Sequence, residues 1–309
     1  MSGNVKCIPE TRKSANHHNL EVSSHVKILI SADMEGVCGV SSWVHVTPPE
    51  YGSTPSSTIE YERARQRLTK EVNAAVEGAL AGGVDEVIVN DAHNGMRNLI
   101  PEELHRDVRF ITGSDKSWGM MQGIEEAQGG AVFFVGYHAR AGTLGAPLAH
   151  TWTGYLLDVR FNGRSTGEYG INAAVAGHFL SPIILVTGDD QAVAQTKAFL
   201  VQDIRGVVVK TGYSSTSAIH LHPERAQALI REGAEAAVRA VDQVKPWTLP
   251  KDCTVELEFD HPSRADTCLY HPGVTRVGER AVSFMAADGA SLFRTFRALM
   301  RASDVRLSL

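Results

Sequence analysis

Two acidic residues, Asp33 and Glu35, follow an apolar run at residues 26–30 in which only Lys27 is charged. A run of this kind that ends in small residues and then glycine is typical of a buried strand leaving its sheet. Side chains alternate along a strand, so both carboxylates are expected to point the same way. Adjacent carboxylates repel each other, and a divalent cation between them removes that cost. The pattern suggests a metal site, although a turn-capping Asp33 with a solvated Glu35 is the simpler alternative for these residues alone.

Histidines follow two further apolar runs. Residues 86–89 lead to His93, and residues 131–135 lead to His138. Imidazoles bind zinc and similar metals, although a single histidine beside a strand is more often a hydrogen-bonding partner. Ligands in open α/β sheets bind beyond the carboxyl ends of the strands. Three strands that each end in metal-binding residue types therefore favour a metal site more strongly than any one of them.

Helical patterns separate these strands. Residues 59–81 carry apolar side chains at helical spacing and are followed by two glycines, and residues 223–241 repeat the pattern after a proline. Alternating strands and helices predict an α/β fold with a mostly parallel central sheet flanked by helices. The loop at residues 41–58, rich in Pro, Ser and Thr, is long enough to shape a site or an interface.

The chain divides into three expected segments. Residues 1–25 are polar, lack the apolar stretch of a secretory signal, and are expected to be a disordered or weakly docked extension. Residues 26–245 are expected to form the α/β core. Residues 246–309 begin with a proline-containing linker and continue with an alternating strand at 255–259 and a final helix. This last segment is predicted to be a smaller C-terminal subdomain packed on the core.

The composition is that of an ordinary globular protein, with 309 residues, 43% hydrophobic and 21% charged. A net charge of −5 and a pI near 6.2 argue against nucleic acids and anionic membranes as partners. No apolar stretch reaches the roughly 18 residues of a membrane span. The four cysteines form no Cys-x-x-Cys pair, which fits a reducing compartment, and the expected location is cytoplasmic.

Further residues are weaker candidates when each is taken alone. Glu168 opens a helical pattern with glycines on both sides, where a glutamate is commonly a partner of the helix dipole. Asp91 lies two residues before His93 and could either orient its imidazole or bond to a turn. Asn172 and Arg140 are candidate substrate contacts.

Five motifs together resemble a known family. They are Ser-Ala-Asp33-Met-Glu35-Gly, Val-Asn-Asp91-Ala-His93, Gly-Tyr-His138-Ala-Arg, His150, and Gly-Glu168-Tyr-Gly-Ile-Asn. Their order and spacing are similar to those of the D-aminopeptidase family of dinuclear zinc peptidases (peptidase family M55, dipeptide-transport-operon type). The resemblance covers residues 26–300, and the C-terminal third carries little motif evidence.

The resemblance implies two Zn²⁺ ions per subunit. Asp33 would bridge the two ions, with Glu35 and His138 completing one site. The same resemblance implies that His93 and Glu168 complete the other.

His150 matches the position that is catalytic in the family. Three roles stay open for it: a general acid–base, a hydrogen-bond donor to the tetrahedral oxyanion, and a nucleophile, which a metal-bound hydroxide would make unnecessary.

The resemblance also implies a function and an assembly. Family members release N-terminal D-amino acids from short peptides such as D-Ala-D-Ala, and they form homodecamers of two stacked five-fold rings. Three carboxylates and two imidazoles carry a charge of −3 against the +4 of two zinc ions, which favours a zinc-bound hydroxide as the attacking group. The protein is therefore expected to be a metalloprotease with aminopeptidase activity on D-amino acid peptides.

Two other functions fit the same residues. One is a dinuclear metal hydrolase that acts on a non-peptide amide or a phosphate ester, for which Arg140 is the only obvious cation near the motifs. The other is a non-catalytic, metal-stabilised assembly protein. Structural zinc sites are usually closed and rich in cysteine, which counts against this second alternative.

Overall fold

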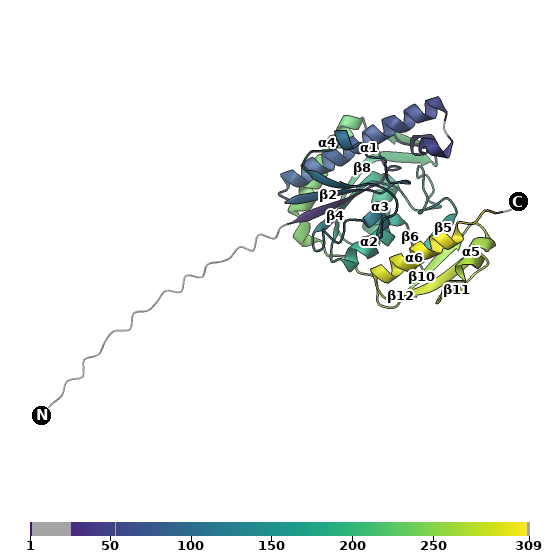
Figure 1. Cartoon of the computed structure of the whole chain (residues 1–309). Helices are drawn as coiled ribbons and strands as arrows, with labels where there is room; N and C mark the ends of the chain where they lie inside the picture. The colour runs from purple at the N-terminus through teal and green to yellow at the C-terminus, as the bar shows by residue number, and fades with distance from the viewer. Residues whose placement is uncertain (2–25, 53, 308–309) are drawn as a thin grey trace.

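The computed structural model describes Met1, residues 26–52 and residues 54–307. The extension predicted at residues 1–25 therefore lies outside the described residues, apart from Met1. Figure 1 shows the chain from purple at its N-terminus to yellow at its C-terminus. The described elements form a larger layered body and a smaller sheet with two helices beside it.

Within the described residues, the larger sheet has the strand order β3-β2-β1-β4-β7-β8-β9. Every neighbouring pair is parallel except β8 and β9, which form a hairpin at the edge. The strands are β1 (Lys27–Ala32), β2 (Glu86–Asp91), β3 (Val108–Ile111), β4 (Ala131–Tyr137), β7 (Ile183–Asp189), β8 (Arg205–Ser214) and β9 (Ser217–His220). This arrangement confirms the predicted mostly parallel central sheet.

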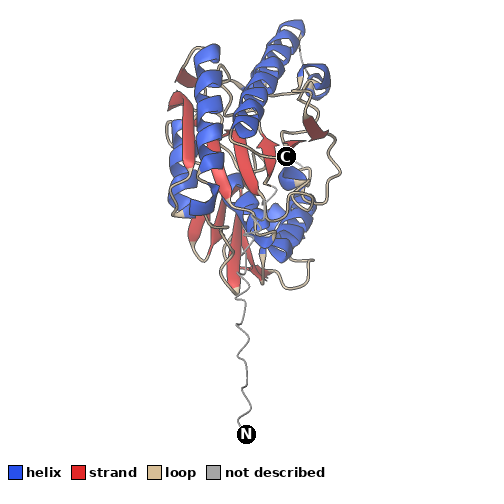
Figure 2. Cartoon of the chain, turned by 90° about the vertical axis from the view of Figure 1, so that its left-hand side faces the viewer, coloured by secondary structure: helices blue, strands red, loops and turns tan. Residues whose placement is uncertain are grey.

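Helices cover both faces of this sheet, as Figures 1 and 2 show. Ile28 and Ile30 of β1 pack in one core with α1 (Pro55–Ala81) and α4 (Pro223–Arg239). Leu29 points to the opposite face and packs in the second core, to which α2 (Glu168–His178) and α3 (Asp190–Leu200) contribute. The strands are apolar on both faces because both faces are covered.

The helix α1 begins at Pro55, four residues before the expected start. The Thr54 side chain accepts a hydrogen bond from the Ser57 backbone at 3.3 Å, and the Ser57 side chain accepts one from the Thr54 backbone at 2.8 Å. This reciprocal capping stabilises the first turn. The preceding loop contains two short 3-10 helices, η1 (Trp43–His45) and η2 (Pro49–Tyr51). Three others are η3 (Pro101–Glu103), η4 (Gly119–Met121) and η5 (Val241–Gln243).

The smaller sheet is antiparallel, with the order β11-β12-β10-β5-β6 in the described part of the chain. Its elements are β5 (Leu156–Phe161), β6 (Arg164–Thr166), β10 (Cys253–Phe259), α5 (Pro262–Cys268), β11 (Thr275–Arg276), β12 (Ala281–Ala286) and α6 (Gly289–Ser303). Two of its strands therefore precede residue 246 and three follow it. The division of the chain at residue 246 stays a prediction, but the sheet itself joins segments from both sides of that boundary.

Candidate metal centre and active site

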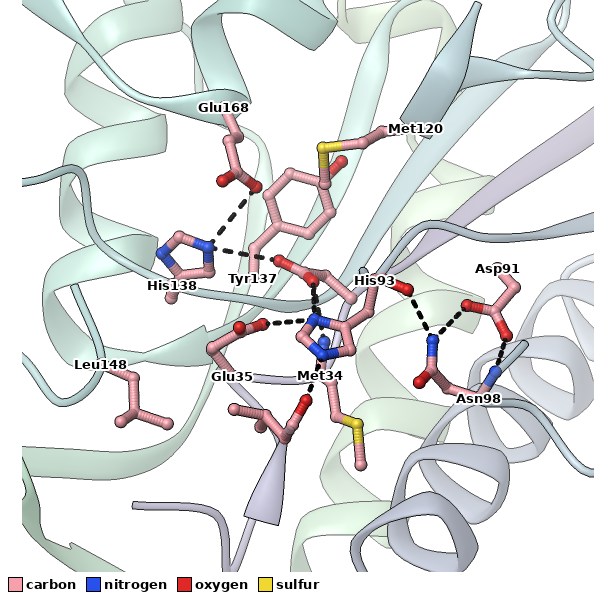
Figure 3. A network of polar contacts seen from close by, with 12 residues as sticks. Met34, Glu35, Asp91, His93, Asn98, Met120, Tyr137, His138, Leu148 and Glu168 are labelled. Carbon is pink, nitrogen blue, oxygen red and sulfur yellow. Dashed lines mark hydrogen bonds and ion pairs between the residues drawn. The ribbon is translucent and has the colours of Figure 1, made fainter. Parts of the chain in front are cut away.

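All five predicted metal ligands are buried and lie beside the carboxyl ends of β1, β2 and β4. Figure 3 shows four of them, Glu35, His93, His138 and Glu168, gathered in one place. Asp33 and Glu35 follow β1, His93 follows β2, and His138 follows β4. Glu168 is the first residue of α2 and faces this edge. The parallel order of these strands brings together side chains that are up to 135 residues apart in the chain (33 to 168).

A close contact between β1 and β4 sets the separation of two of these residues. The backbone N–H of Asp33 donates to Val135 O, and that of Gly36 donates to Gly136 O, both at 2.8 Å. A Cβ on Gly36 would lie 1.9 Å from Tyr137 O. A Cβ on Gly136 would lie 2.1 Å from Asp33 O, and Gly136 has a φ of 72°. Only glycine at these positions allows the two backbones to approach so closely.

Asp33 lies between two histidines and presents one carboxylate oxygen to each. Its Oδ1 is 3.5 Å from Nδ1 of His93, and its Oδ2 is 3.4 Å from Nε2 of His138. The same His93 nitrogen is 3.0 Å from Glu35 Oε2, and the same His138 nitrogen is 3.4 Å from Glu168 Oε2. Asp33 therefore lies between the two imidazoles, with one oxygen toward each.

Backbone carbonyls hold the other nitrogen of each imidazole. His93 donates from Nε2 to Val46 O at 2.7 Å, and His138 donates from Nδ1 to Ala139 O at 2.9 Å. Since a carbonyl can only accept, each neutral ring carries its proton on that nitrogen and directs its lone pair at the carboxylates. Metal-binding histidines in proteins are commonly oriented in this way.

The carboxylates and imidazoles strongly perturb one another. Burial and the neighbouring Glu35 raise the pKa of Asp33 to about 7. Burial alone would lower the pKa of His138, but the carboxylates of Glu168 and Asp33 outweigh it and raise that pKa to about 10. Burial also acts to lower the pKa of His93. The carboxylates of Glu35 and Asp33 outweigh burial and raise that pKa well above its ordinary value. The carboxylates thus require positive charge beside them.

Several atoms of this cluster have no hydrogen-bond partner among the described residues. They are Oδ2 of Asp33, Oε2 of Glu35 and Nε2 of His138. Buried polar atoms are rarely left unpartnered, and clustered ones need an explanation such as an ion. The ligand atoms of Asp33, Glu35 and His138 all lie within 4.8 Å of one another. Their oxygen and nitrogen donors suit zinc, so the residues fit the predicted metal.

The nearest neighbours of the two histidines do not match the two ligand sets that the family resemblance implies. The resemblance pairs His93 with Glu168, whereas the nearest carboxylates to His93 here are Asp33 and Glu35. Glu168 lies nearest to His138, and its Oε1 accepts a hydrogen bond from the Trp152 backbone at 2.7 Å. The assignment of ligands to individual ions stays a prediction.

His150 lies against the same cluster. Its ring stacks on that of His138, with centroids 4.1 Å apart and an interplanar angle of 8°. Its Nδ1 donates to Leu148 O at 2.9 Å, and its Nε2 is 3.8 Å from Glu168 and 4.0 Å from Glu35. Burial and the charge of His138 lower the pKa of His150. Its Nε2, which the backbone does not hold, faces the carboxylates.

A cavity of about 670 Å³ opens onto these residues. Its wall includes four of the predicted ligands (Asp33, Glu35, His93 and Glu168) together with His150. The remaining wall contains residues that the sequence did not single out: Trp43, Met96, Met120, Trp152, Tyr155, Arg297, Met300, Arg301 and Asp304. These side chains come from loops, from the 3-10 helices η1 and η4, and from α6, and no periodic pattern or motif distinguishes them in the sequence.

The weaker candidates have other roles. The Asp91 carboxylate accepts hydrogen bonds from the backbone of Asn98 and Leu99, so it bonds to a turn and does not orient the imidazole of His93. The side chain of Asn172 is buried and donates to Tyr137 Oη at 2.8 Å. Arg140 bonds to the backbone of Ala141 and is absent from the described cavity wall.

Residues 26–298 match the model of peptidase family M55, described as D-aminopeptidase. The D-aminopeptidase of Bacillus subtilis (strain 168) is 34% identical over 264 residues, which cover 85% of this chain and 92% of that protein. A solved structure of the Zn-dependent D-aminopeptidase DppA from Bacillus subtilis, described as a self-compartmentalizing protease, matches with a TM-score of 0.84 and 30% identity. This match covers 92% of this chain and all of that one.

None of the helices in the described residues is long and apolar enough to cross a membrane. The larger sheet, the buried carboxylate–histidine cluster and the match over residues 26–298 lead to one conclusion. The chain belongs to the D-aminopeptidase family, peptidase family M55.

Proposed function

We propose that the protein is a zinc-dependent aminopeptidase that hydrolyses the N-terminal amide bond of short peptides containing D-residues, such as D-Ala-D-Ala. The observation that carries this proposal is the position of Asp33, which presents one oxygen to His93 and the other to His138. The relatives support the same reaction, since the one of known structure is a Zn-dependent D-aminopeptidase.

Two zinc ions are proposed for each subunit, held by Asp33, Glu35, His93, His138 and Glu168. When bound, they would supply the Lewis acidity that activates water near neutral pH and polarises the scissile carbonyl. Three buried carboxylates leave an excess of negative charge that two divalent cations would neutralise. The two imidazoles, each fixed by a backbone carbonyl, need no rearrangement to offer their lone pairs.

His150 is proposed to act as the general acid–base. Its Nδ1 proton is held by Leu148 O, so Nε2 is free to accept a proton and later return it to the leaving amine. The same tautomer has no proton on Nε2 for an oxyanion, which disfavours the donor role. One alternative is a ligand role, because the ligand atoms of His150, His138 and Glu168 lie within 4.8 Å of one another.

Metal analysis combined with an activity panel tests the proposal. The zinc-loaded protein is expected to contain two zinc ions per chain and to release D-Ala from D-Ala-D-Ala in a metal-dependent manner. The L-stereoisomer serves as the matched control for stereochemistry. Absence of amide hydrolysis across D- and L-dipeptides would rule the proposal out.

A phosphate ester belongs on the same panel. Arg297 and Arg301 line the cavity, and phosphoesterases use cations near the phosphate. Turnover of a phosphate ester without turnover of any peptide would favour the dinuclear hydrolase alternative.

The protein is further proposed to assemble into a homodecamer. A relative of known structure is described as a self-compartmentalizing protease, which is consistent with active sites enclosed by several subunits. The cytoplasmic location stays a prediction from the cysteine usage.

A further inference from the structure

Arg297 lies on α6, in the wall of the cavity that also contains Asp33, Glu35 and His150. The side chain is half-buried. It comes from the smaller sheet and its helices, whereas the predicted ligands come from the larger sheet and α2. A ligand in this cavity would therefore contact both parts of the molecule.

The Arg297 guanidinium rests on aromatic rings. It lies 5.7 Å from the ring centroid of Trp152 and 5.8 Å from that of Phe293, and it donates one hydrogen bond to Lys116 O at 3.3 Å. The Trp152 backbone donates in turn to Glu168 Oε1 at 2.7 Å. The surface that supports Arg297 is thus connected directly to one of the predicted metal ligands.

Arg297 has no carboxylate within ion-pair distance among the described residues. Its neighbour Arg301 is exposed and lies 3.6 Å from the highly exposed Asp115, a pair of little energetic weight. Asp304 also lines the cavity, but no ion pair joins it to either arginine in the described chain. Burial and the positive charge of Arg301 lower the pKa of Arg297. An anionic ligand beside Arg297 would relieve both effects.

We propose that Arg297 binds the free C-terminal carboxylate of a short peptide whose N-terminal amide lies at the carboxylate–histidine cluster. A guanidinium binds a carboxylate through two parallel hydrogen bonds, which a backbone carbonyl or an amide cannot reproduce. The inference rests on the proposed function and extends it to substrate selection. Arg297 is then a specificity residue that favours short peptides with a free C-terminus, which fits a cavity of about 670 Å³.

The test compares D-Ala-D-Ala with its C-terminal amide, by following consumption of each substrate in the wild-type and variant zinc-loaded proteins. Arg297→Gln keeps a shorter polar side chain and removes the charge. Arg294→Gln is the matched control, since Arg294 lies on the same helix, stacks on Trp118 at 5.7 Å and is exposed. Arg297→Lys separates charge from two-point hydrogen bonding.

The wild type is expected to prefer the free acid. Arg297→Gln should lower kcat/KM for the free acid about 10- to 100-fold, the range for a charge-assisted hydrogen bond, and change the value for the amide less than about 3-fold. Arg297→Lys should retain part of the preference, and Arg294→Gln all of it.

Two results would overturn the inference. If Arg297→Gln lowers turnover of both substrates equally, or of neither, the arginine only packs against Trp152 and Phe293, and the proposed function still stands. If the wild type hydrolyses neither substrate nor any other peptide on the panel, the proposed function fails and the inference fails with it.

Discussion

Each histidine around the carboxylates uses one ring nitrogen for the backbone and directs the other at the cluster. This division holds for His93, His138 and His150, whose partners are the carbonyls of Val46, Ala139 and Leu148. A backbone carbonyl cannot lose its accepting role when the pH changes, so the tautomer is fixed by the fold. The difference between His150 and the other two is its distance from the carboxylates, 3.8 Å or more.

Replacing His150 tests whether it transfers protons or binds metal. His150→Ala is expected to lower kcat about 100- to 10,000-fold, the usual contribution of general acid–base catalysis, while the zinc content stays at the wild-type value. The measurements are steady-state kinetics and metal analysis on the same preparation. A loss of zinc in parallel with activity would instead make His150 a ligand.

A second residue-scale prediction concerns Glu71, which is buried on α1 away from the cavity wall. Its Oε1 accepts a hydrogen bond from the Cys38 backbone at 2.8 Å, and burial raises its pKa from 4.5 to about 7. The folded protein holds this proton more tightly than the unfolded chain. The favourable contribution is therefore complete below about pH 4.5 and is lost as the pH rises through 7.

Glu71→Gln removes this titration and keeps the shape of the side chain. The free energy of unfolding of the wild type, relative to that of the variant, is expected to fall by about 3 kcal/mol between pH 4.5 and 8. Denaturant unfolding at several pH values measures the difference. A difference independent of pH would show that Glu71 does not carry a proton in the folded protein at neutral pH.

At the scale of elements, the approach of β1 to β4 determines where Asp33 and His138 meet. Gly136→Ala adds a Cβ 2.1 Å from Asp33 O at a φ of 72°. We expect it to destabilise the protein by at least about 3 kcal/mol, combining the cost of a left-handed alanine with a backbone clash, and to lower the zinc content.

Gly129→Ala is the matched control for this substitution. Gly129 has a φ of 75°, and a Cβ there meets nothing within 4 Å. Gly129→Ala should therefore lower the free energy of unfolding only by the conformational cost of a left-handed alanine, about 1–2 kcal/mol, and should leave the zinc content at the wild-type value. Thermal unfolding and metal analysis on both variants measure the two effects, and equal losses would contradict a role for close strand approach.

The sequence predicted β1, β2 and β4 of the larger sheet because their signals are local. Asp33, His93 and His138 each follow an apolar run, and parallel strands place such ends at one edge. The smaller sheet could not be predicted in the same way. Its central pair joins Val255 to Phe161, and no local pattern encodes a contact across that separation.

The residues of the cavity wall could not be predicted from the sequence for a similar reason. Arg297 lies in an ordinary amphipathic helix, where an arginine usually faces solvent. Trp43 and Val46 lie in a loop whose length suggested a site, but nothing in its composition indicated that the Val46 carbonyl would hold His93. Side chains in loops are positioned by tertiary contacts, which the local sequence does not report.

At the scale of the whole molecule, the proposed assembly gives a direct prediction. The native mass in solution is expected to be ten times that of the 33.4 kDa chain. Native mass spectrometry or light scattering measures it, and unfolding conditions provide the monomer control. A monomer with full peptidase activity would show that a complete active site does not need the assembly.

The ribosome makes the predicted metal ligands before it makes part of the cavity wall. All five predicted ligands lie between Asp33 and Glu168, and β5 and β6 precede residue 167, whereas α6 spans Gly289–Ser303. A nascent chain on the ribosome therefore exposes the cluster, together with the strand β5, whose partner β10 has not yet been translated. Arg297 can select peptides only after α6 has emerged from the ribosome and docked. A shortened translation product that kept every predicted ligand but lacked α6 would therefore lack that selection.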